Sequence, residues 1–305
     1  MTADGHGRNL AAALFGAVAI SFSAIHVRFA AVSPVTAAVF RSAYALPLLW
    51  AAWLMVRRRD RRPARARFIA FGSGLALAAD LVAWHASIQW IGAGLATLLA
   101  NVQVVVVTLA AWALFGERPS RRSLAALPVV LAGVALVTGL GRSGTFGDRP
   151  VLGVALGVTA AVFYGVFLLA YRRSNRSLAP ALGPLLDATA GALVGSLVAG
   201  VALPVLAFDP RPSWPAHGWL LLLAVGTQIV GWLLIGYALP RLPARETSFL
   251  ILAQPVLTMV WGALLFAERV SAVQAAGVVL VLAGIAAVVT ERREPRLARS
   301  VPADG

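Results

Sequence analysis

The stretch GLATLLANVQVVVVTLAAWALFGERPSRRSLAALPVVLAGVAL, residues 94–136, returns later in the chain as RETSFLILAQPVLTMVWGALLFAERVSAVQAAGVVLVLAGIAA, residues 245–287. The two stretches align without a gap, so that Gln103 falls on Gln254 and Glu117 falls on Glu268. An internal duplication of this length in a strongly apolar chain predicts a membrane transporter that is built from two related halves.

The composition favours a bilayer over water. Of the 305 residues, 60% are hydrophobic and 12% are charged, and the mean hydropathy is +0.83. A soluble domain carries about 25% charged residues. The absence of cysteine excludes a disulfide framework, a thiolate metal site and a cysteine nucleophile. Long apolar spans separate the basic residues, so the formal charge of +14 indicates a cationic membrane face rather than nucleic-acid binding.

Ten apolar stretches are long enough to cross a hydrocarbon core, which takes about 20 helical residues. We therefore predict an all-α integral membrane protein with ten transmembrane helices in two inverted five-helix repeats. A cytoplasmic N-terminal segment (1–9) precedes the first repeat (10–140). An external linker (141–150) joins it to the second repeat (151–290), and a cytoplasmic tail (291–305) follows. The predicted spans are residues 10–31, 35–56, 68–90, 94–115, 123–140, 151–171, 180–207, 218–239, 246–266 and 271–290.

The arginines predict the orientation of these spans. With the N-terminus inside, 20 of the 26 arginines fall on inner segments, four on outer loops and two within spans. This bias predicts cytoplasmic termini. The lysine-free composition, rich in Ala, Gly, Arg and Val, indicates a bacterial protein, and hence a bacterial inner membrane. An odd number of spans in each half inverts the second half relative to the first. The loop after Glu117 accordingly carries three arginines, whereas its copy after Glu268 carries one.

The chain resembles the EamA-type transporters of the drug/metabolite transporter superfamily. The resemblance lies in the sequence from Leu252 to Arg269, in Phe115 to Arg118, and in Phe22 to Arg28 with Pro34 and Arg41 after it. It implies a five-plus-five helix fold and transport of amino acids or other small metabolites. Fold-level kinship does not choose among these substrates.

Ionisable residues inside a span are expensive and are candidates for function. Helical rise places Arg41 and Asp80 at nearly the same depth, with His26, Arg28 and His85 close to the same membrane boundary. These five groups are expected to form one polar cluster in the outer half of the first repeat. The alternative is an Arg41–Asp80 pair that only fixes helix packing.

The second half repeats the spacing between a proline and a charged residue, in the inverted orientation. Pro180 precedes Asp187 by seven residues, as Pro34 precedes Arg41. Two opposite charges at symmetry-related depths would suit a zwitterion, whereas the alternative is interfacial solvation of Asp187 beside an arginine loop.

Uncharged polar residues supply the remaining candidates for the transport path. Asn101 lies on a polar face of the fourth span, Gln103 and Gln254 coincide in the repeat register, and Pro255 is expected to kink the ninth span. Tyr164 lies deep in the sixth span and offers a ring for substrate stacking. Helix–helix hydrogen bonding and packing are the alternatives for these side chains. Glu117 and Glu268 are interpreted as caps of the helices that they precede.

A secondary transporter is the predicted function, moving an amino acid or related zwitterion outward by alternating access. The alternatives are a lipid-modifying membrane enzyme that uses Asp80 and His85, and a non-transporting membrane partner. Neither a cofactor nor a metal is expected. The expected partners are the substrate and the lipid bilayer, with a homodimer as an option and no nucleic acid.

Overall fold

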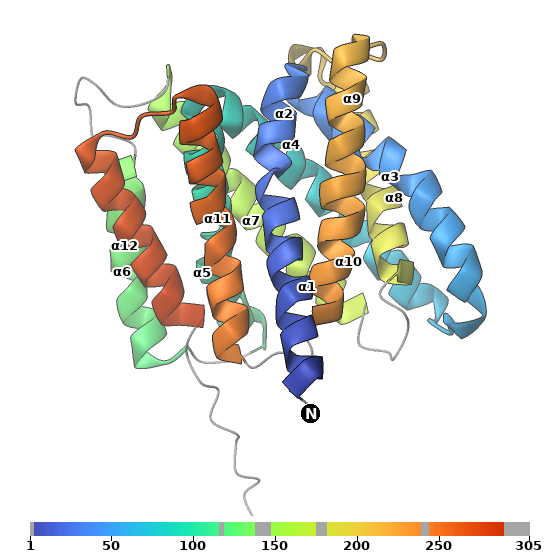
Figure 1. Ribbon diagram of the computed structural model, residues 1–305, viewed down its shortest axis with the longest axis horizontal. Helices are drawn as coiled ribbons and strands as arrows, with labels where there is room; N and C mark the ends of the chain where they lie inside the picture. Colours follow the sequence, from blue (N-terminus) through green and yellow to red (C-terminus); the bar gives the residue numbers. More distant parts are fainter. Residues whose placement is uncertain (1–2, 116–118, 138–147, 175–181, 239–243, 290–305) are drawn as a thin grey trace, which may run out of the picture.

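A computed structural model describes residues 3–115, 119–137, 148–174, 182–238 and 244–289 (Figure 1). All the regular elements in these ranges are helices. They are α1 (Ala3–Ser21), α2 (Ser23–Ala30), α3 (Pro34–Val56), α4 (Ala64–Ala100), α5 (Gln103–Phe115), α6 (Arg121–Val137), α7 (Pro150–Ser174), α8 (Leu182–Ala202), α9 (Trp214–Leu222), a π-helix (Leu223–Gly231), α10 (Trp232–Ala238), α11 (Ala244–Phe266) and α12 (Ala272–Val289), with 3-10 turns at Arg57–Arg59 and Pro204–Leu206.

The helices have the length and polarity of membrane spans. Among the described residues, two shorter apolar helices accompany six runs that are long and apolar enough to cross a bilayer. Large apolar side chains such as Leu131, Val198 and Leu264 are exposed on the surface, which is where lipid would cover them. The fold is therefore an all-helical multi-pass membrane fold, and the count of ten spans stays a prediction. The six runs are His6–Ala30, Pro34–Arg59, Ala64–Ala110, Pro150–Tyr171, Leu182–Ala202 and Trp214–Ile235.

The two sequence repeats begin at opposite ends of the helix bundle. The chain starts at the lower end in Figure 1, and α1 and α2 run upward from there. Helix α7 instead starts at the upper end, because Gly153 in its first turn packs on Trp90 and Ile91. Trp90 lines a pocket together with Arg28, which lies near the end of α2. The second half thus crosses the bundle in the opposite sense.

The chain bends at Gly92, inside the short connection between the third and fourth predicted spans. Gly92 has a φ of 78° and divides α4 into two helical segments. A positive φ favours glycine because a side chain would clash with the backbone. Gly94 lies close to Met259, to whose Cγ an added Cβ would come within 2.8 Å. Both glycines are therefore needed where α4 turns against α11.

The predicted fourth span, residues 94–115, is not one continuous helix. Helix α4 ends at Ala100, and α5 begins only at Gln103. The Asn101 side chain donates to the carbonyl oxygen of Thr97 (2.8 Å), and i to i+3 backbone bonds replace the regular pattern. Asparagine favours such local bonds over helix continuation, which explains the break.

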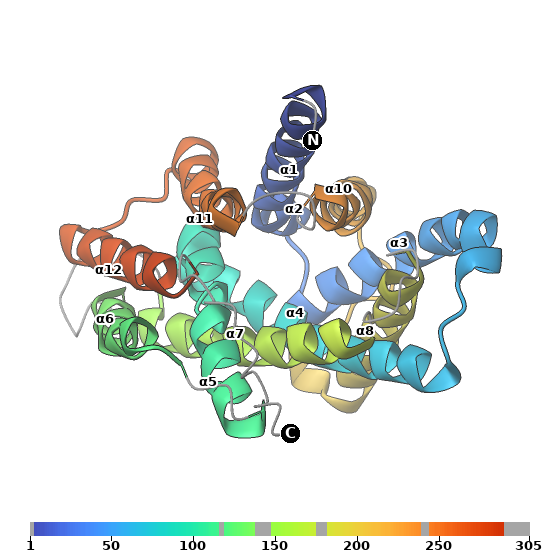
Figure 2. The same cartoon turned by 90° about the horizontal axis from the view of Figure 1, so that it is seen from below.

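Helices α6 and α12 occupy corresponding positions in the two repeats and lie side by side at one edge of the molecule (Figure 2). Glycines bring their backbones together. A Cβ added at Gly277 would lie 2.6 Å from the carbonyl oxygen of Gly133, and one at Gly133 would lie 2.8 Å from the carbonyl oxygen of Gly277. The contact resembles the small-residue packing that joins helices in membranes.

Gly277→Val is expected to destabilise the protein by about 1–3 kcal/mol, because the new side chain meets backbone that has no room to move. Thermal unfolding of the purified protein in detergent measures this loss. Gly72→Val is the matched control, since an added Cβ at Gly72 meets nothing within 4 Å. Equal losses at the two positions would contradict the packing argument.

Candidate functional site

The centre of the molecule holds a buried arginine that connects the two halves. Arg41 of α3 is only 5% exposed. Its Nε donates to Gln228 Oε1 of the π-helix (2.8 Å), and its Nη1 donates to Ser23 Oγ of α2 (3.3 Å). Gln228 in turn donates to Thr189 Oγ1 of α8 (3.4 Å). The Arg41 guanidinium thus links α2 and α3 of the first half to α8 and the π-helix of the second.

A carboxylate lies near this guanidinium without pairing with it. Asp80 of α4 is 7% exposed and interacts electrostatically with Arg41 and with Tyr164 of α7. Within the described residues, the Asp80 carboxylate forms no ion pair within 4.0 Å and accepts no hydrogen bond. A buried carboxylate without such partners is costly unless a ligand supplies them.

Other buried polar atoms, on His26, on His85 and on its neighbour Trp84, also lack partners among the described residues. The side chains of His26 and His85 both interact electrostatically with the Arg41 guanidinium. His85 Nδ1 donates to the carbonyl oxygen of Pro34 (3.0 Å), which leaves Nε2 without a partner. His26 Nδ1 and Trp84 Nε1 are likewise buried and unpaired in the described part of the chain. Buried polar atoms are normally hydrogen-bonded, so a group of exceptions marks a place for water or a solute.

Irregular helices connect to this centre. Helices α1 and α2 meet at Phe22, and the preceding Ser21 accepts hydrogen bonds from α11: Thr258 donates to its carbonyl oxygen (2.9 Å) and Trp261 donates to its hydroxyl (3.0 Å). The π-helix carries Gln228. π-helices often occur at functional sites.

A second polar cluster lies at the upper end of the bundle. The Glu268 carboxylate follows α11 and accepts from the backbone N–H groups of Ala93 (2.8 Å) and Gly94 (3.2 Å). It also pairs with the Arg28 guanidinium, which lies over the Phe266 ring at 4.4 Å from the centroid. Because carboxylates stabilise helix N-termini, Glu268 fastens the second segment of α4 to α2 and α11.

This geometry corrects the interpretation of Glu268 as a cap of the helix after it. The start of α12 is capped instead by Ser271 and Gln274, which exchange side chain–backbone hydrogen bonds. Glu268 caps a helix of the other repeat, about 175 residues away in sequence. Glu117 lies outside the described residues. The Arg28 guanidinium, which was expected in the Arg41 cluster, pairs with Glu268.

A third cluster occupies the lower end. Arg62 Nε and Nη2 donate to the two oxygens of Asp60 (2.8 and 2.9 Å), and Trp53 Nε1 donates to Asp60 Oδ2 (2.9 Å). Arg62 Nη2 also pairs with Asp187 Oδ2 of α8 at 2.9 Å, and Arg67 approaches the same oxygen at 3.8 Å. The loop between α3 and α4 is therefore bound to the second half.

Asp60→Asn is expected to reduce stability at neutral pH but not below about pH 2. Hydrogen bonds from Arg62 hold the pKa of Asp60 at about 2, below the value of about 3.9 in an unfolded chain. The carboxylate therefore stabilises the fold above about pH 4, and this contribution disappears as the pH falls through 2.

Thermal unfolding of both proteins across this pH range checks the expectation. Asp209→Asn provides a control, since that exposed carboxylate accepts a single backbone hydrogen bond, from Arg211. A difference between wild type and Asp60→Asn that stays constant down to pH 2 would contradict it.

The structure brings some predicted residues together and separates others. Arg41, Asp80, His85 and Tyr164 gather around the centre. Asp187 does not join them, and among the described residues it pairs with Arg62 of the loop between α3 and α4; residues 175–181 before α8 lie outside the described ranges.

The positions of the three amide candidates, Asn101, Gln103 and Gln254, do not assign them to the central site. Asn101 uses its side-chain amide on Thr97. Gln103 opens α5 and Gln254 lies beside Pro255 in α11, both half-buried. Neither of these two side chains hydrogen-bonds another described residue.

Sequence reasoning missed Ser23 and Gln228, which accept hydrogen bonds from Arg41, and Thr189, which accepts one from Gln228. Neutral polar residues of this kind are common in membrane helices, so their identity alone does not mark a site. Gln228 differs from the others because it lies in the π-helix, which only the structure shows. Among the described residues, no group of three His, Asp or Glu side chains is placed to hold a metal ion.

Comparisons with known proteins agree with the two-repeat organisation. A crystal structure described only as that of a protein matches with a TM-score of 0.60 and 20% sequence identity, over 93% of this chain and 97% of that one. This likeness concerns the fold alone. No match was found among curated proteins. The model of the EamA-like transporter family matches residues 9–139 and again residues 151–290, so the chain belongs to the EamA-like transporter family.

Proposed function

We propose that the protein is a secondary transporter that exports an amino acid or related zwitterion by alternating access between its two halves. The proposal rests on the polar residues around Arg41, which lie at the boundary between the repeats. There Arg41 and Asp80 are both buried but not paired with each other within the described residues. A zwitterion fits two separated opposite charges, with its carboxylate near Arg41 and its ammonium near Asp80.

Polar clusters at the two ends of the bundle support alternating access. Arg28–Glu268 joins the halves at one end, and Arg62–Asp187 joins them at the other. Opening one end while the other stays closed would require only one cluster to separate at a time. The Glu268 carboxylate holds the N–H groups of Ala93 and Gly94, and release of these hydrogen bonds would open the upper cluster.

The enzyme alternative rested on an Asp80–His85 pair, and the hydrogen bonding does not favour it. His85 donates to Pro34, and its second nitrogen is unpaired within the described residues. A general base needs hydrogen-bond contact with the group that it activates or orients.

Flux of labelled amino acids, amines and other metabolites into proteoliposomes tests the proposed function. Wild-type protein is expected to carry amino acids faster than amines or carboxylates of similar size. The matched variant Gln254→Ala distinguishes cavity lining from helix packing, because loss of a cavity-lining amide lowers flux at unchanged stability. Absence of saturable flux for every zwitterion would exclude the proposed substrate class.

The proposed orientation predicts which cysteines an impermeant reagent labels in intact cells. Arg58→Cys should be protected, because it lies on the lower loop that we place in the cytoplasm, whereas Arg211→Cys should be labelled. Both side chains are exposed, so accessibility within the fold does not limit labelling. Asp60, at the middle of the same loop, is unsuitable because it belongs to the lower cluster. If the reagent labelled Arg58→Cys but not Arg211→Cys, the protein would have the orientation opposite to the one proposed.

A further inference from the structure

A pocket of about 390 Å³ opens at the upper end of the bundle, apart from the Arg41 centre. Val27, Arg28 and Val32 line one side of it, and Ile88, Gln89 and Trp90 of α4 line the other. Asp148, just before α7, completes the lining. The volume is at the lower end of the range for small-molecule sites, which suits a metabolite-sized solute.

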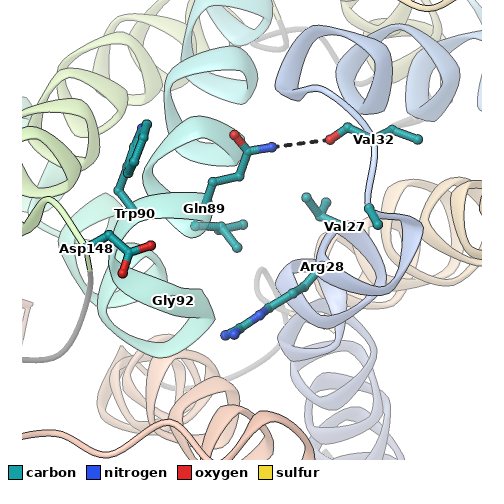
Figure 3. Close-up of a pocket in the computed structure, with 9 residues that line it drawn as sticks. Val27, Arg28, Val32, Gln89, Trp90, Gly92 and Asp148 are labelled. Carbon is teal, nitrogen blue, oxygen red and sulfur yellow. Dashed lines mark hydrogen bonds between the residues drawn. The ribbon is translucent and has the colours of Figure 1, made fainter.

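The pocket presents opposite charges from two sides. Figure 3 shows the Asp148 carboxylate and the Arg28 guanidinium, both directed into the space between them. Within the described residues, the Asp148 carboxylate has no ion-pair or hydrogen-bond partner. The Gln89 amide donates to the carbonyl oxygen of Val32 (3.3 Å), which leaves its own oxygen as an acceptor. Asp148 and Gln89 together therefore offer acceptors to an ammonium group.

Arg28 retains donors for a second anionic partner. Glu268 Oε1 occupies Nη1, but the side chain is still one-third exposed and its other nitrogens hydrogen-bond no described residue. A guanidinium carries five N–H donors and binds carboxylates well. A solute carboxylate can therefore join Glu268 on Arg28.

The balance of charge selects the class of solute. The Arg28 guanidinium pairs with Glu268, whereas the Asp148 carboxylate has no ion pair within the described residues, and the guanidinium of the neighbouring Arg149 lies 5.1 Å from the centroid of the Trp90 ring. A net anion or cation would leave one side of this arrangement uncompensated. The apolar walls formed by Val27, Val32 and Ile88 favour an aliphatic side chain on the solute.

We infer that this pocket is a second solute site, which binds a zwitterionic amino acid with its ammonium on Asp148 and Gln89 and its carboxylate on Arg28. The inference rests on the proposed function, because it assigns the same class of substrate to a vestibule on the transport path. A carboxylate on Arg28 competes with Glu268, so occupancy of the pocket weakens the cluster that closes this end.

The test measures binding of labelled L-leucine to the purified full-length protein at millimolar concentrations. Isoamylamine and isovalerate serve as competitors that carry only the ammonium or only the carboxylate. Asp148→Asn should weaken leucine and isoamylamine binding about tenfold, the effect of losing a charge-assisted hydrogen bond, and leave isovalerate unchanged. Asp209→Asn, which removes the same charge from an exposed position, should change none of the three.

Variants at the centre separate this site from the proposed function. Leucine binding that persists in Asp80→Asn but weakens in Asp148→Asn supports the pocket. Binding that is lost in Asp80→Asn and unchanged in Asp148→Asn overturns the pocket while leaving the central site in place. Absence of saturable leucine binding to the wild type overturns the pocket as well. The flux assay then decides the proposed function separately, since a protein can carry another zwitterion without binding leucine here.

Discussion

Asp80→Asn should lower zwitterion transport by about 10- to 100-fold without unfolding the protein. The expected factor follows from the loss of one charge-assisted hydrogen bond to the substrate ammonium, worth about 1.5–3 kcal/mol. Asparagine has nearly the shape of aspartate, and the wild-type carboxylate has no hydrogen bond to another described residue that the amide would break. Flux per folded molecule in proteoliposomes, together with thermal unfolding in detergent, measures both parts of the expectation.

A double variant separates recognition from helix packing. If Asp80 only compensates the charge of Arg41, each single neutralisation leaves a buried charge, and the pair Arg41→Gln, Asp80→Asn restores stability and transport. If the two residues bind substrate, the double variant stays inactive. The geometry favours the second result, because Arg41 is held by Gln228 and Ser23 and not by Asp80. Full recovery of flux in the double variant would exclude the recognition role.

Glu268→Ala is expected to cost about 3 kcal/mol of stability. The substitution removes the cap from Ala93 and Gly94 and leaves the Arg28 guanidinium without its carboxylate. Breaking a buried pair from one side costs about 3–5 kcal/mol, and the partial exposure of Arg28 places the value at the lower limit. Thermal unfolding in detergent measures the loss, with Arg269→Ala at the exposed neighbouring position as the control.

Gly262 provides an independent test of the same cluster. A Cβ at this position would clash with Glu268 Oε2, so Gly262→Ala should displace the carboxylate and cause part of the same loss. In a Glu268→Ala background the clash disappears, and Gly262→Ala should then have little further effect. Additive losses in the double variant would show that Gly262 and Glu268 act independently.

The sequence located the central charges because ionisable side chains stand out in apolar spans. Arg41 and Asp80 were expected at one depth from helical rise alone, and the structure places them within electrostatic range. Their mutual arrangement was not predictable. A helical-rise argument gives the height of a residue in the membrane but not the direction of its side chain, and Arg41 turns toward Gln228 of the other half.

Glu268 illustrates the same limit for longer-range contacts. Its position before α12 suggested a local cap, since a carboxylate stabilises the nearest helix N-terminus when nothing competes. The bend at Gly92 exposes another helix N-terminus within reach, and Ser271 and Gln274 already cap α12. Which helix start lies nearest is a property of the packed bundle.

The amino-acid sequence by itself determined the duplication, the helical class and the membrane location, because repeat register and hydropathy are recorded along the chain. It also determined the family, which the matches over residues 9–139 and 151–290 show. Only the tertiary structure decided the partners of Arg28, Arg41 and Asp187, the break at Asn101 and the pocket beside Asp148. These features depend on which helix faces meet across the two repeats, and many neutral polar side chains satisfy the same sequence pattern before packing selects among them.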